Sequence, residues 1–326
     1  MTAGRRWPAI AAAALVLCPA PAVGQGGGLP EWQAMNPLAI SRSGLYFQPY
    51  REPRKGLVFS LALDYASTAE VALGRTKVDT TELLDTELMR FTVGLRHDLG
   101  PDWYVAAKVG VGGSYDGVMD GFLDFYHGLF GISFPERDNR PHNQFAYYIK
   151  PYPGLRKTRE KDGFYLGDTR ISAGRRLSQH WQGEFSMTLP TATAPEGYGT
   201  GVVTWSLMAD ARSRLSGHWT YEGSAGLGYS PVHGDLAQWQ NEVTALVSSG
   251  IRWRFAGKSS LYTNFILQTP YYHDAYIAPM DRVDFDLDFG YILRSKGGHE
   301  FRLGMTEDIY PSGPAIDLIF RFGYNW

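Results

Sequence analysis

The stretch Ile316-Asp317-Leu318-Ile319-Phe320-Arg321-Phe322-Gly323-Tyr324-Asn325-Trp326 decides the fold. Apolar residues occupy every second position of it, and Ile319 is the single exception among the intervening residues. Such alternation is typical of a β-strand with one apolar and one polar face. The apolar face becomes aromatic toward Trp326, as expected for a strand whose outer face meets lipid and whose aromatic residues lie at the membrane interface. We therefore expect a transmembrane β-strand here.

The same alternation recurs along the chain and predicts twelve strands. It is clearest in residues 281–294, where Val283, Phe285 and Leu287 alternate with aspartates that suit a wet lumen. The predicted strands lie near 57–66, 84–97, 103–112, 165–177, 180–190, 200–214, 217–229, 241–256, 259–269, 281–294, 299–309 and 314–326.

The connections between these segments alternate between short and long, which predicts the topology. The short ones are at 98–102, 177–180, 215–218, 256–258 and 295–298. The long ones are at 67–83, 113–163, 190–200, 230–240, 270–280 and 310–314. Short periplasmic turns and long outer loops are the arrangement of outer-membrane barrels. We predict an all-β protein, a closed antiparallel transmembrane β-barrel of about 12 strands. Fourteen strands result if 69–78 or 144–150 adds a pair, and a soluble β-sandwich is the alternative fold.

Composition narrows the functional classes. The formal net charge is −2, which gives no indication of nucleic-acid binding. The chain contains 38 Gly and 20 Tyr, as expected for strands around a crowded lumen and for an aromatic girdle. Cys18 is the only cysteine, and it lies in the predicted signal segment. We expect no disulfide, no thiol chemistry and no Cys-based metal site in the mature chain. We assign no metal ligand and no cofactor.

The N-terminal residues predict export. Arg5 and Arg6 precede the apolar run 10–17, and Ala22-Val23-Gly24 offers small residues for cleavage before Gln25. We therefore expect three parts: a signal peptide at 1–24, a periplasmic N-terminal segment at 25–55, and an outer-membrane barrel at 56–326.

One segment, 113–163, is too long for an ordinary hairpin loop. Within it, residues 118–130 predict a helix with an apolar face and with Asp124 and His127 on another face. We expect this helix to be lumenal or to cap the lumen.

A set of short motifs, in order along the chain, resembles an uncharacterised family of Gram-negative outer-membrane β-barrels known only as a domain of unknown function. The matching residues are Asn36-Pro37-Leu38, Asp85, Glu87, Arg90, Gly121-Phe122-Leu123-Asp124, His127, Gly131, Arg137, Gly167-Asp168, Leu189-Pro190-Thr191 and Gly199-Thr200-Gly201. The resemblance implies the fold and the outer-membrane location, and it implies no activity. The tail with Phe322, Tyr324 and Trp326 also resembles the C-terminal signal that the barrel assembly machinery reads.

Several polar groups are candidate site residues, each with two interpretations. The candidate lumen or plug residues are Asp85, Glu87, Arg90, Asp124, His127, Arg137 and Asp168. Asp124 and His127 suit either half of a hydrolytic dyad or, as we favour, a structural pair. Asp284, Asp286 and Asp288 suit either a cation site or, with Arg302, a lumenal charge ladder. We favour the ladder, because alternate strand positions are about 7 Å apart.

These observations favour a passive pore or binder in the cell outer membrane for a small or hydrophobic solute, gated by segment 113–163. The alternatives are a lipid-modifying hydrolase using His127 and a structural barrel without transport. Lipid and lipopolysaccharide are the expected partners. The basic loop residues Arg156, Lys157, Arg159 and Lys161 suit either lipopolysaccharide phosphates or a solvated loop.

Overall fold

The computed structural model describes residues 29–42, 44–73, 80–131, 141–295, 298–309 and 318–326. The predicted signal peptide with Cys18, and the candidate residue Arg137, lie outside the described residues. No helix among the residues described is long and apolar enough to cross a membrane.

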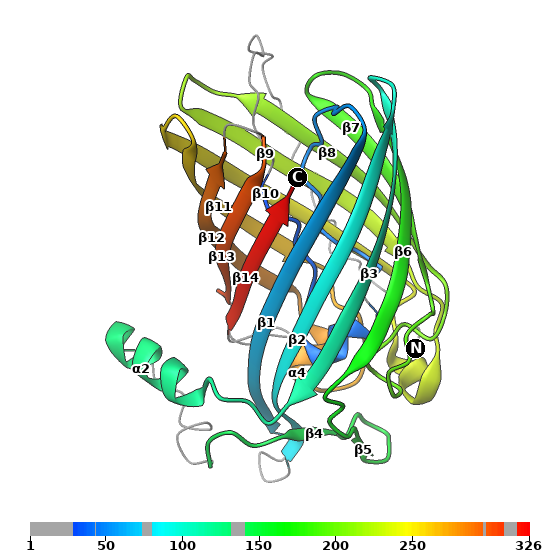
Figure 1. Cartoon of the computed structure of the whole chain (residues 1–326). Helices are drawn as coiled ribbons and strands as arrows, with labels where there is room; N and C mark the ends of the chain where they lie inside the picture. The colour runs from blue at the N-terminus through cyan, green and yellow to red at the C-terminus, as the bar shows by residue number, and fades with distance from the viewer. Residues whose placement is uncertain (1–28, 43, 74–79, 132–140, 296–297, 310–317) are drawn as a thin grey trace, which may run out of the picture.

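Twelve strands form one closed antiparallel barrel (Figure 1). They are β1 Leu57–Leu73, β2 Thr80–Leu99, β3 Trp103–Tyr115, β6 Tyr165–Arg176, β7 Trp181–Leu189, β8 Thr204–Arg214, β9 Trp219–Tyr229, β10 Val243–Ala256, β11 Ser259–Gln268, β12 Asp284–Arg294, β13 Glu300–Asp308 and β14 Leu318–Asn325. Each strand pairs with its neighbours in chain order, and β14 pairs with β1, which closes the barrel. The predicted twelve-stranded barrel is therefore confirmed.

Two further short strands, β4 Ala146–Ile149 and β5 Lys157–Thr158, extend the sheet without entering the barrel wall. β4 pairs with Glu82 to Asp85 at the far end of β2, and β5 pairs only with β4. The wall therefore contains twelve strands, and residues 144–150 add a short extension of the sheet beside the long loops.

The two ends of the barrel differ as predicted. Five short turns and the end of β14 lie at one end, and the long connections lie at the other (Figure 1). Trp103, Trp181 and Trp219 each begin a strand at the short-turn end, and Tyr324 and Trp326 lie beside the start of β1 at the same end. Because short turns face the periplasm in outer-membrane barrels, we call the opposite, long-loop end the outer end.

The wall separates an apolar outer face from a polar inner face. On β7, Phe185 is half exposed on the outside, whereas Glu184 and Ser186 are buried on the inside. This alternation recurs on β8 to β13, because successive strand residues point to opposite faces. Lipid offers no hydrogen-bond partners, so a sheet that spans the membrane must be closed to pair its backbone groups within the wall. Its outer face must be apolar for the same reason. The protein is an outer-membrane β-barrel.

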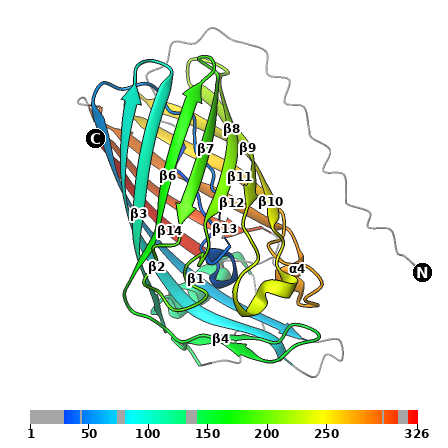
Figure 2. The same ribbon diagram turned by 90° about the vertical axis from the view of Figure 1, so that its right-hand side faces the viewer.

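Residues 29–55 fill the lumen, which corrects the expectation of a periplasmic segment at 25–55 (Figure 2). Trp32 and Phe47 are fully buried and pair as an antiparallel bridge, so the segment runs toward the outer end and returns. The backbone carbonyl oxygens of Glu31 and Gln33 accept hydrogen bonds from the wall residue Arg321. We call residues 29–55 the lumenal segment.

The outer end of the lumen is closed by an apolar cluster. Helix α1 Pro37–Ile40 stands at its centre, and the Asn36 side chain accepts a hydrogen bond from the Leu38 backbone N–H, 2.8 Å away, to cap it. Around Leu38 pack residues of β4, of the 3₁₀ helix η1 Gly234–Trp239 and of α4 Ala278–Asp281. The long loops therefore cover the lumen with buried side chains.

The predicted helix exists as α2 Asp120–Phe130, but it lies outside the barrel (Figure 1). Met119 and Leu123 pack on Leu318, and the ring of Phe122 lies 5.6 Å from that of Phe320 on the outer face of β14. The lumenal or capping position is therefore wrong. Only part of the helix contacts the wall, because Phe125 and Leu129 of the predicted apolar face are each 69% exposed.

Candidate functional site

Three neighbouring cavities follow the lumenal segment from mid-barrel toward the periplasmic end. Their volumes are about 180, 70 and 410 Å³. Arg51, Lys108 and Arg302 line both the first and the second, and Arg294 and Glu300 line both the second and the third. The shared side chains make the three cavities one row, which we call the basic passage.

Positive charge predominates along this row. The charged lining of the first cavity is Arg51, Arg90, Lys108, Arg170, Arg302 and Arg321 against Glu31, Asp64 and Asp168. The charged lining of the third is Arg212, Arg214, Arg252, Arg254, Lys258 and Arg294 against Glu52 and Glu300. A lining with excess positive charge in a narrow, low-dielectric channel attracts anions and repels cations.

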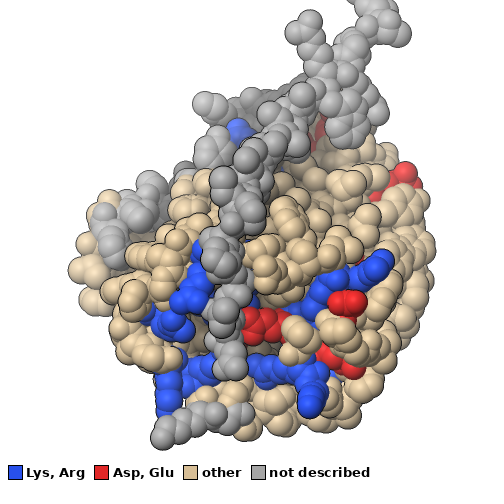
Figure 3. Space-filling view, turned by 90° about the horizontal axis from the view of Figure 1, so that it is seen from above, with Lys and Arg blue, Asp and Glu red and all other residues tan. Residues whose placement is uncertain are grey.

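The third cavity opens at the short-turn end. Figure 3 looks onto that end, where Lys and Arg side chains surround a hollow that also holds acidic groups. Arg212 pairs with Glu52 at 2.8 Å, and Arg294 pairs with Glu300 at 3.0 Å, so the two acids at this mouth already have cationic partners. Arg254 donates a hydrogen bond to the Gly217 carbonyl oxygen and lines the cavity with its charged side chain.

Glu184 of β7 anchors the returning arm of the lumenal segment. Its carboxylate is buried and accepts hydrogen bonds from Tyr46, from Gln48 and from Tyr104 of β3. Ser224 of β9 donates to the Gln48 carbonyl oxygen at 3.1 Å. Polar contacts to three wall strands therefore fix this arm.

Glu31 ties the outgoing arm to both the returning arm and the wall. It pairs with Arg51 at 3.1 Å, with Lys108 of β3, and with Arg170 of β6 at 3.8 Å. One carboxylate thus balances three cations at the centre of the first cavity. Removing it would leave those cations facing one another.

The predicted site residues divide between the two faces of the wall. Arg90 and Asp168 do line the first cavity. Arg90 pairs with Asp64 at 2.8 Å, and Asp168 accepts hydrogen bonds from the backbone of Ala192 and Thr200, which holds the 190–203 loop at the outer end.

The other described lumen or plug candidates lie outside the lumen. Glu87 shares the outward face of β2 with Phe91, and its carboxylate accepts hydrogen bonds from the backbone of Val118 and Met119 just before α2. Asp85 shares that parity, on the part of β2 that pairs with β4.

Asp124 and His127 are on α2 and also lie outside the lumen. Asp124 pairs with His142 at 2.9 Å, and His127 lies 3.9 Å from Glu307 at the end of β13. Asp124 and His127 therefore have partners other than each other.

The residues of the predicted charge ladder have other described partners. Arg302 pairs with Glu300, and Asp288 accepts a hydrogen bond from Thr306 at 2.9 Å. Asp284 and Asp286 instead approach Asp308. The basic loop pairs mostly with nearby acids: Arg159 contacts Asp235 at 2.8 Å, for example.

Sequence reasoning missed the residues that organise the passage. Glu31, Arg51, Tyr46 and Gln48 come before the first strand, where alternation gives no signal. The available signal was the density of large apolar and aromatic residues in 29–50, which is unusual for a segment exposed to the periplasm.

A family model described as "Protein of unknown function (DUF3187)" matches residues 35–326. No curated protein matches the chain. Among solved structures, an outer membrane channel from Pseudomonas putida F1 shares 12% identity, covering 84% of this chain and 96% of that one, with a TM-score of 0.54. The NanC porin shares 6% identity over 83% and 99% of the two chains, with a TM-score of 0.45. The P. putida toluene transporter TodX shares 9% identity over 89% and 92%, with a TM-score of 0.43. The likeness to the P. putida F1 channel shows the fold.

Proposed function

This chain belongs to that family of unknown function, and we propose that it is a passive outer-membrane channel for a small anionic solute. The observation that carries the proposal is the basic passage, a row of three cavities that share cationic lining residues and open at the periplasmic end. The wall needs no catalytic group for this role, because lining charges alone tune the selectivity of a pore.

The lumenal segment is the gate in this proposal, in place of the 113–163 segment expected from the sequence. It occupies the lumen, where polar anchors such as Glu31 and Glu184 hold it beside the apolar cluster at the outer end. An anion entering the passage competes with Glu31 for Arg51, Lys108 and Arg170. Such competition gives the solute a way to loosen the segment that blocks its path.

The outer closure fits the same scheme. Apolar packing around Leu38 joins α1 to the long loops, so movement of the lumenal segment would also withdraw α1 from the outer mouth. One displacement would thus open both the passage and the outer end.

Ion selectivity in planar bilayers tests the proposal. With a salt gradient across the membrane, the reversal potential of the wild-type channel should show preference for anions. The double variant Arg254→Glu with Lys258→Glu should shift that preference toward cations, because both residues line the third cavity. Lys55→Glu makes the same type of charge change at the same rim, outside the lining of all three cavities, and should leave selectivity unchanged.

The gate is tested separately with Glu31→Ala. Loss of this carboxylate leaves Arg51, Lys108 and Arg170 to repel one another, so the open fraction of single channels should rise. A barrel that stays closed in both wild type and Glu31→Ala, or a cation-selective wild type, would overturn the channel.

A further inference from the structure

The geometry points to a calcium site at the outer end of the lumen, held by Asp284 and Asp286 of β12, Asp308 of β13 and Gln268 of β11. The site is separate from the basic passage, and neither Asp284, Asp286 nor Asp308 lines any of its cavities.

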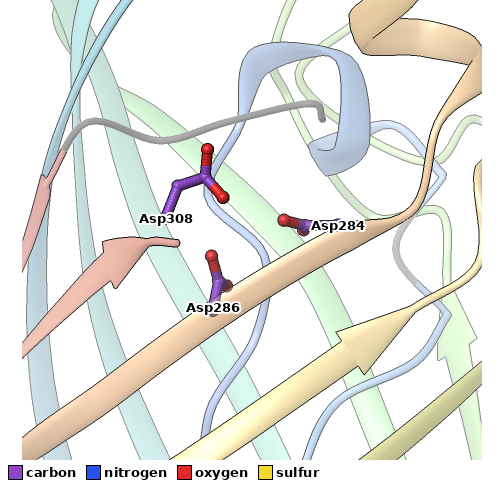
Figure 4. Close-up of side chains that lie close together, drawn as sticks. All are labelled: Asp284, Asp286 and Asp308. Atoms are coloured by element: carbon purple, nitrogen blue, oxygen red, sulfur yellow. The ribbon is translucent and has the colours of Figure 1, made fainter. Parts of the chain in front are cut away.

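The three carboxylates converge from two adjacent strands. Each offers an oxygen atom, and these atoms all lie within 4.8 Å of one another (Figure 4). Asp286 and Asp308 are direct cross-strand partners, and Asp284 lies two residues before Asp286 on the same face. The backbones of alternate residues in one strand are about 7 Å apart, but the carboxylate oxygen atoms of Asp284, Asp286 and Asp308 converge to within 4.8 Å.

The two β12 carboxylates of the cluster are buried, and Arg321, a described cation that acts on Asp286 electrostatically, lies against Asp64 instead. Asp284 and Asp286 are 4% and 2% exposed, and neither makes an ion pair with any described residue. One oxygen of each also has no hydrogen-bond partner there. Buried carboxylates at this separation repel strongly unless they share protons or a cation. A bound divalent cation removes the repulsion and uses the oxygen atoms that are otherwise unsatisfied.

Gln268 is an independent sign of a missing ligand. It is 1% exposed, and neither its amide oxygen nor its amide nitrogen has a hydrogen-bond partner. Gln268 is the direct cross-strand partner of Asp284, so both side chains point to the same lumenal face. An amide next to a carboxylate would ordinarily donate to it. Its failure to do so fits a carbonyl oxygen turned toward a shared ion.

The donor set selects the class of ion. Three carboxylates and an amide supply only oxygen, which hard cations prefer, and no His or Cys belongs to the cluster. Ca²⁺ accepts carboxylate and amide oxygen atoms in flexible geometry, whereas Mg²⁺ demands near-ideal octahedral coordination and gives up its bound water reluctantly. Ca²⁺ therefore fits this cluster better than Mg²⁺.

Calcium binding by the whole purified barrel in detergent tests the site. After chelation and dialysis, titration with CaCl₂ should show one bound ion, and Ca²⁺ should raise the thermal unfolding midpoint. Asp286→Asn and Asp308→Asn should each weaken Ca²⁺ binding by roughly tenfold or more, because affinity depends on the number of charged ligands. Titration with MgCl₂ should give weaker binding.

Asp288→Asn is the matched control. Asp288 is the next lumenal residue on β12 and is hydrogen-bonded to Thr306, so its neutralisation should leave Ca²⁺ affinity unchanged. Without Ca²⁺, Asp286→Asn should unfold at the same or a higher temperature than wild type, because it removes repulsion. That unfolding temperature also excludes misfolding as the cause of lost binding.

Three outcomes would overturn the site: no Ca²⁺ binding by wild type at millimolar concentration, equal loss of binding in Asp288→Asn, or tighter binding of Mg²⁺ than of Ca²⁺. The Ca²⁺ titration does not depend on conductance, so it tests the calcium site independently of the channel.

Discussion

The ring of Trp326 stacks on the ring of Phe59, with centroids 5.2 Å apart and planes inclined by 13°. Two backbone hydrogen bonds, of 3.2 and 3.1 Å, join the same two residues. The pair extends the seam between β1 and β14, which runs from Ser60 opposite Asn325 to Ser67 opposite Leu318. An open seam in lipid would leave backbone groups unsatisfied at several kcal/mol each.

Trp326→Ala should weaken the folded barrel only modestly. The side chain is 40% exposed to its surroundings, so truncation should cost about 1–3 kcal/mol of burial and spare the backbone pair. Urea unfolding of detergent-refolded protein measures this. Trp253→Ala, another stacked girdle residue, should cost a similar amount.

Cellular assembly separates these two variants. If the tail is read by the assembly machinery, Trp326→Ala should lower the amount of inserted barrel sharply, whereas Trp253→Ala should not. Equal outer-membrane levels of the two variants would show that Trp326 has no part in such a signal.

Asp98→Asn should destabilise the barrel strongly. Asp98 pairs with Arg176 and with Arg96, and it accepts a hydrogen bond from the Arg54 backbone at the end of the lumenal segment. Removing the charge leaves two buried guanidinium groups without their shared partner, which costs about 3–5 kcal/mol. Asp102→Asn, on the exposed neighbouring turn, should change the free energy of unfolding by less than ~0.5 kcal/mol. Equal unfolding midpoints of the two variants would contradict this assignment.

Glu87→Ala should release α2 from the wall. The variant leaves the N–H groups of Val118 and Met119 without their acceptor, a local cost of about 1–3 kcal/mol for each buried group. Hydrogen exchange over 118–130 should speed up while exchange in β2 and β3 stays slow. Asp124→Asn weakens a half-exposed ion pair with His142 and should change exchange little. Unchanged exchange in Glu87→Ala would show that α2 is held by other contacts.

Acid should loosen the contact between the loops at Asp235. Burial alone would raise the pKa of this carboxyl, but the hydrogen bond and charge of Arg159, with the charge of Lys157, outweigh burial and lower the pKa. A lowered folded-state pKa stabilises the contact above the ordinary Asp value, and this stabilisation is lost as the pH falls below about 4. The protection of amides 157–160, measured as their exchange rate relative to the intrinsic rate at each pH, should fall in that range, and Asp235→Asn should abolish this pH dependence. Wild-type protection that stays constant down to pH 3 would refute the assignment.

The strands of the wall could be predicted because apolar and polar residues alternate along each of them. Eleven of the twelve strands begin and end within four residues of the predicted ranges, since lipid and lumen impose opposite demands on alternate side chains. The exception is β1, which continues to Leu73 instead of ending near residue 66. The same parity could have placed Glu87 correctly: it is in phase with Phe91 and Val93, which face outward. A resemblance between motifs says nothing of the side of the wall on which a residue lies.

The lumen was not predictable in the same way. The lumenal segment is fixed by contacts with residues far along the chain, such as Glu31 with Arg170 and Tyr46 with Glu184, which no local pattern encodes. The meeting of Asp286 with Asp308 depends on the register between β12 and β13. Helix α2 was predicted from its apolar face, but that periodicity is the same whether lipid-side aromatics or a lumen provide the cover.

The lumenal segment runs directly into β1, and β1 is one side of the seam. The same stretch of chain therefore fills the barrel and begins its wall. A doubled-back segment with buried aromatic rings is hard to thread through a closed ring of twelve strands, so we expect the strands to curl around it before β14 reaches β1. The last step of folding is then the pairing of β14 with β1 around the lumenal segment already in place. A polypeptide whose lumenal segment is misplaced would remain an open sheet with β1 and β14 unpaired.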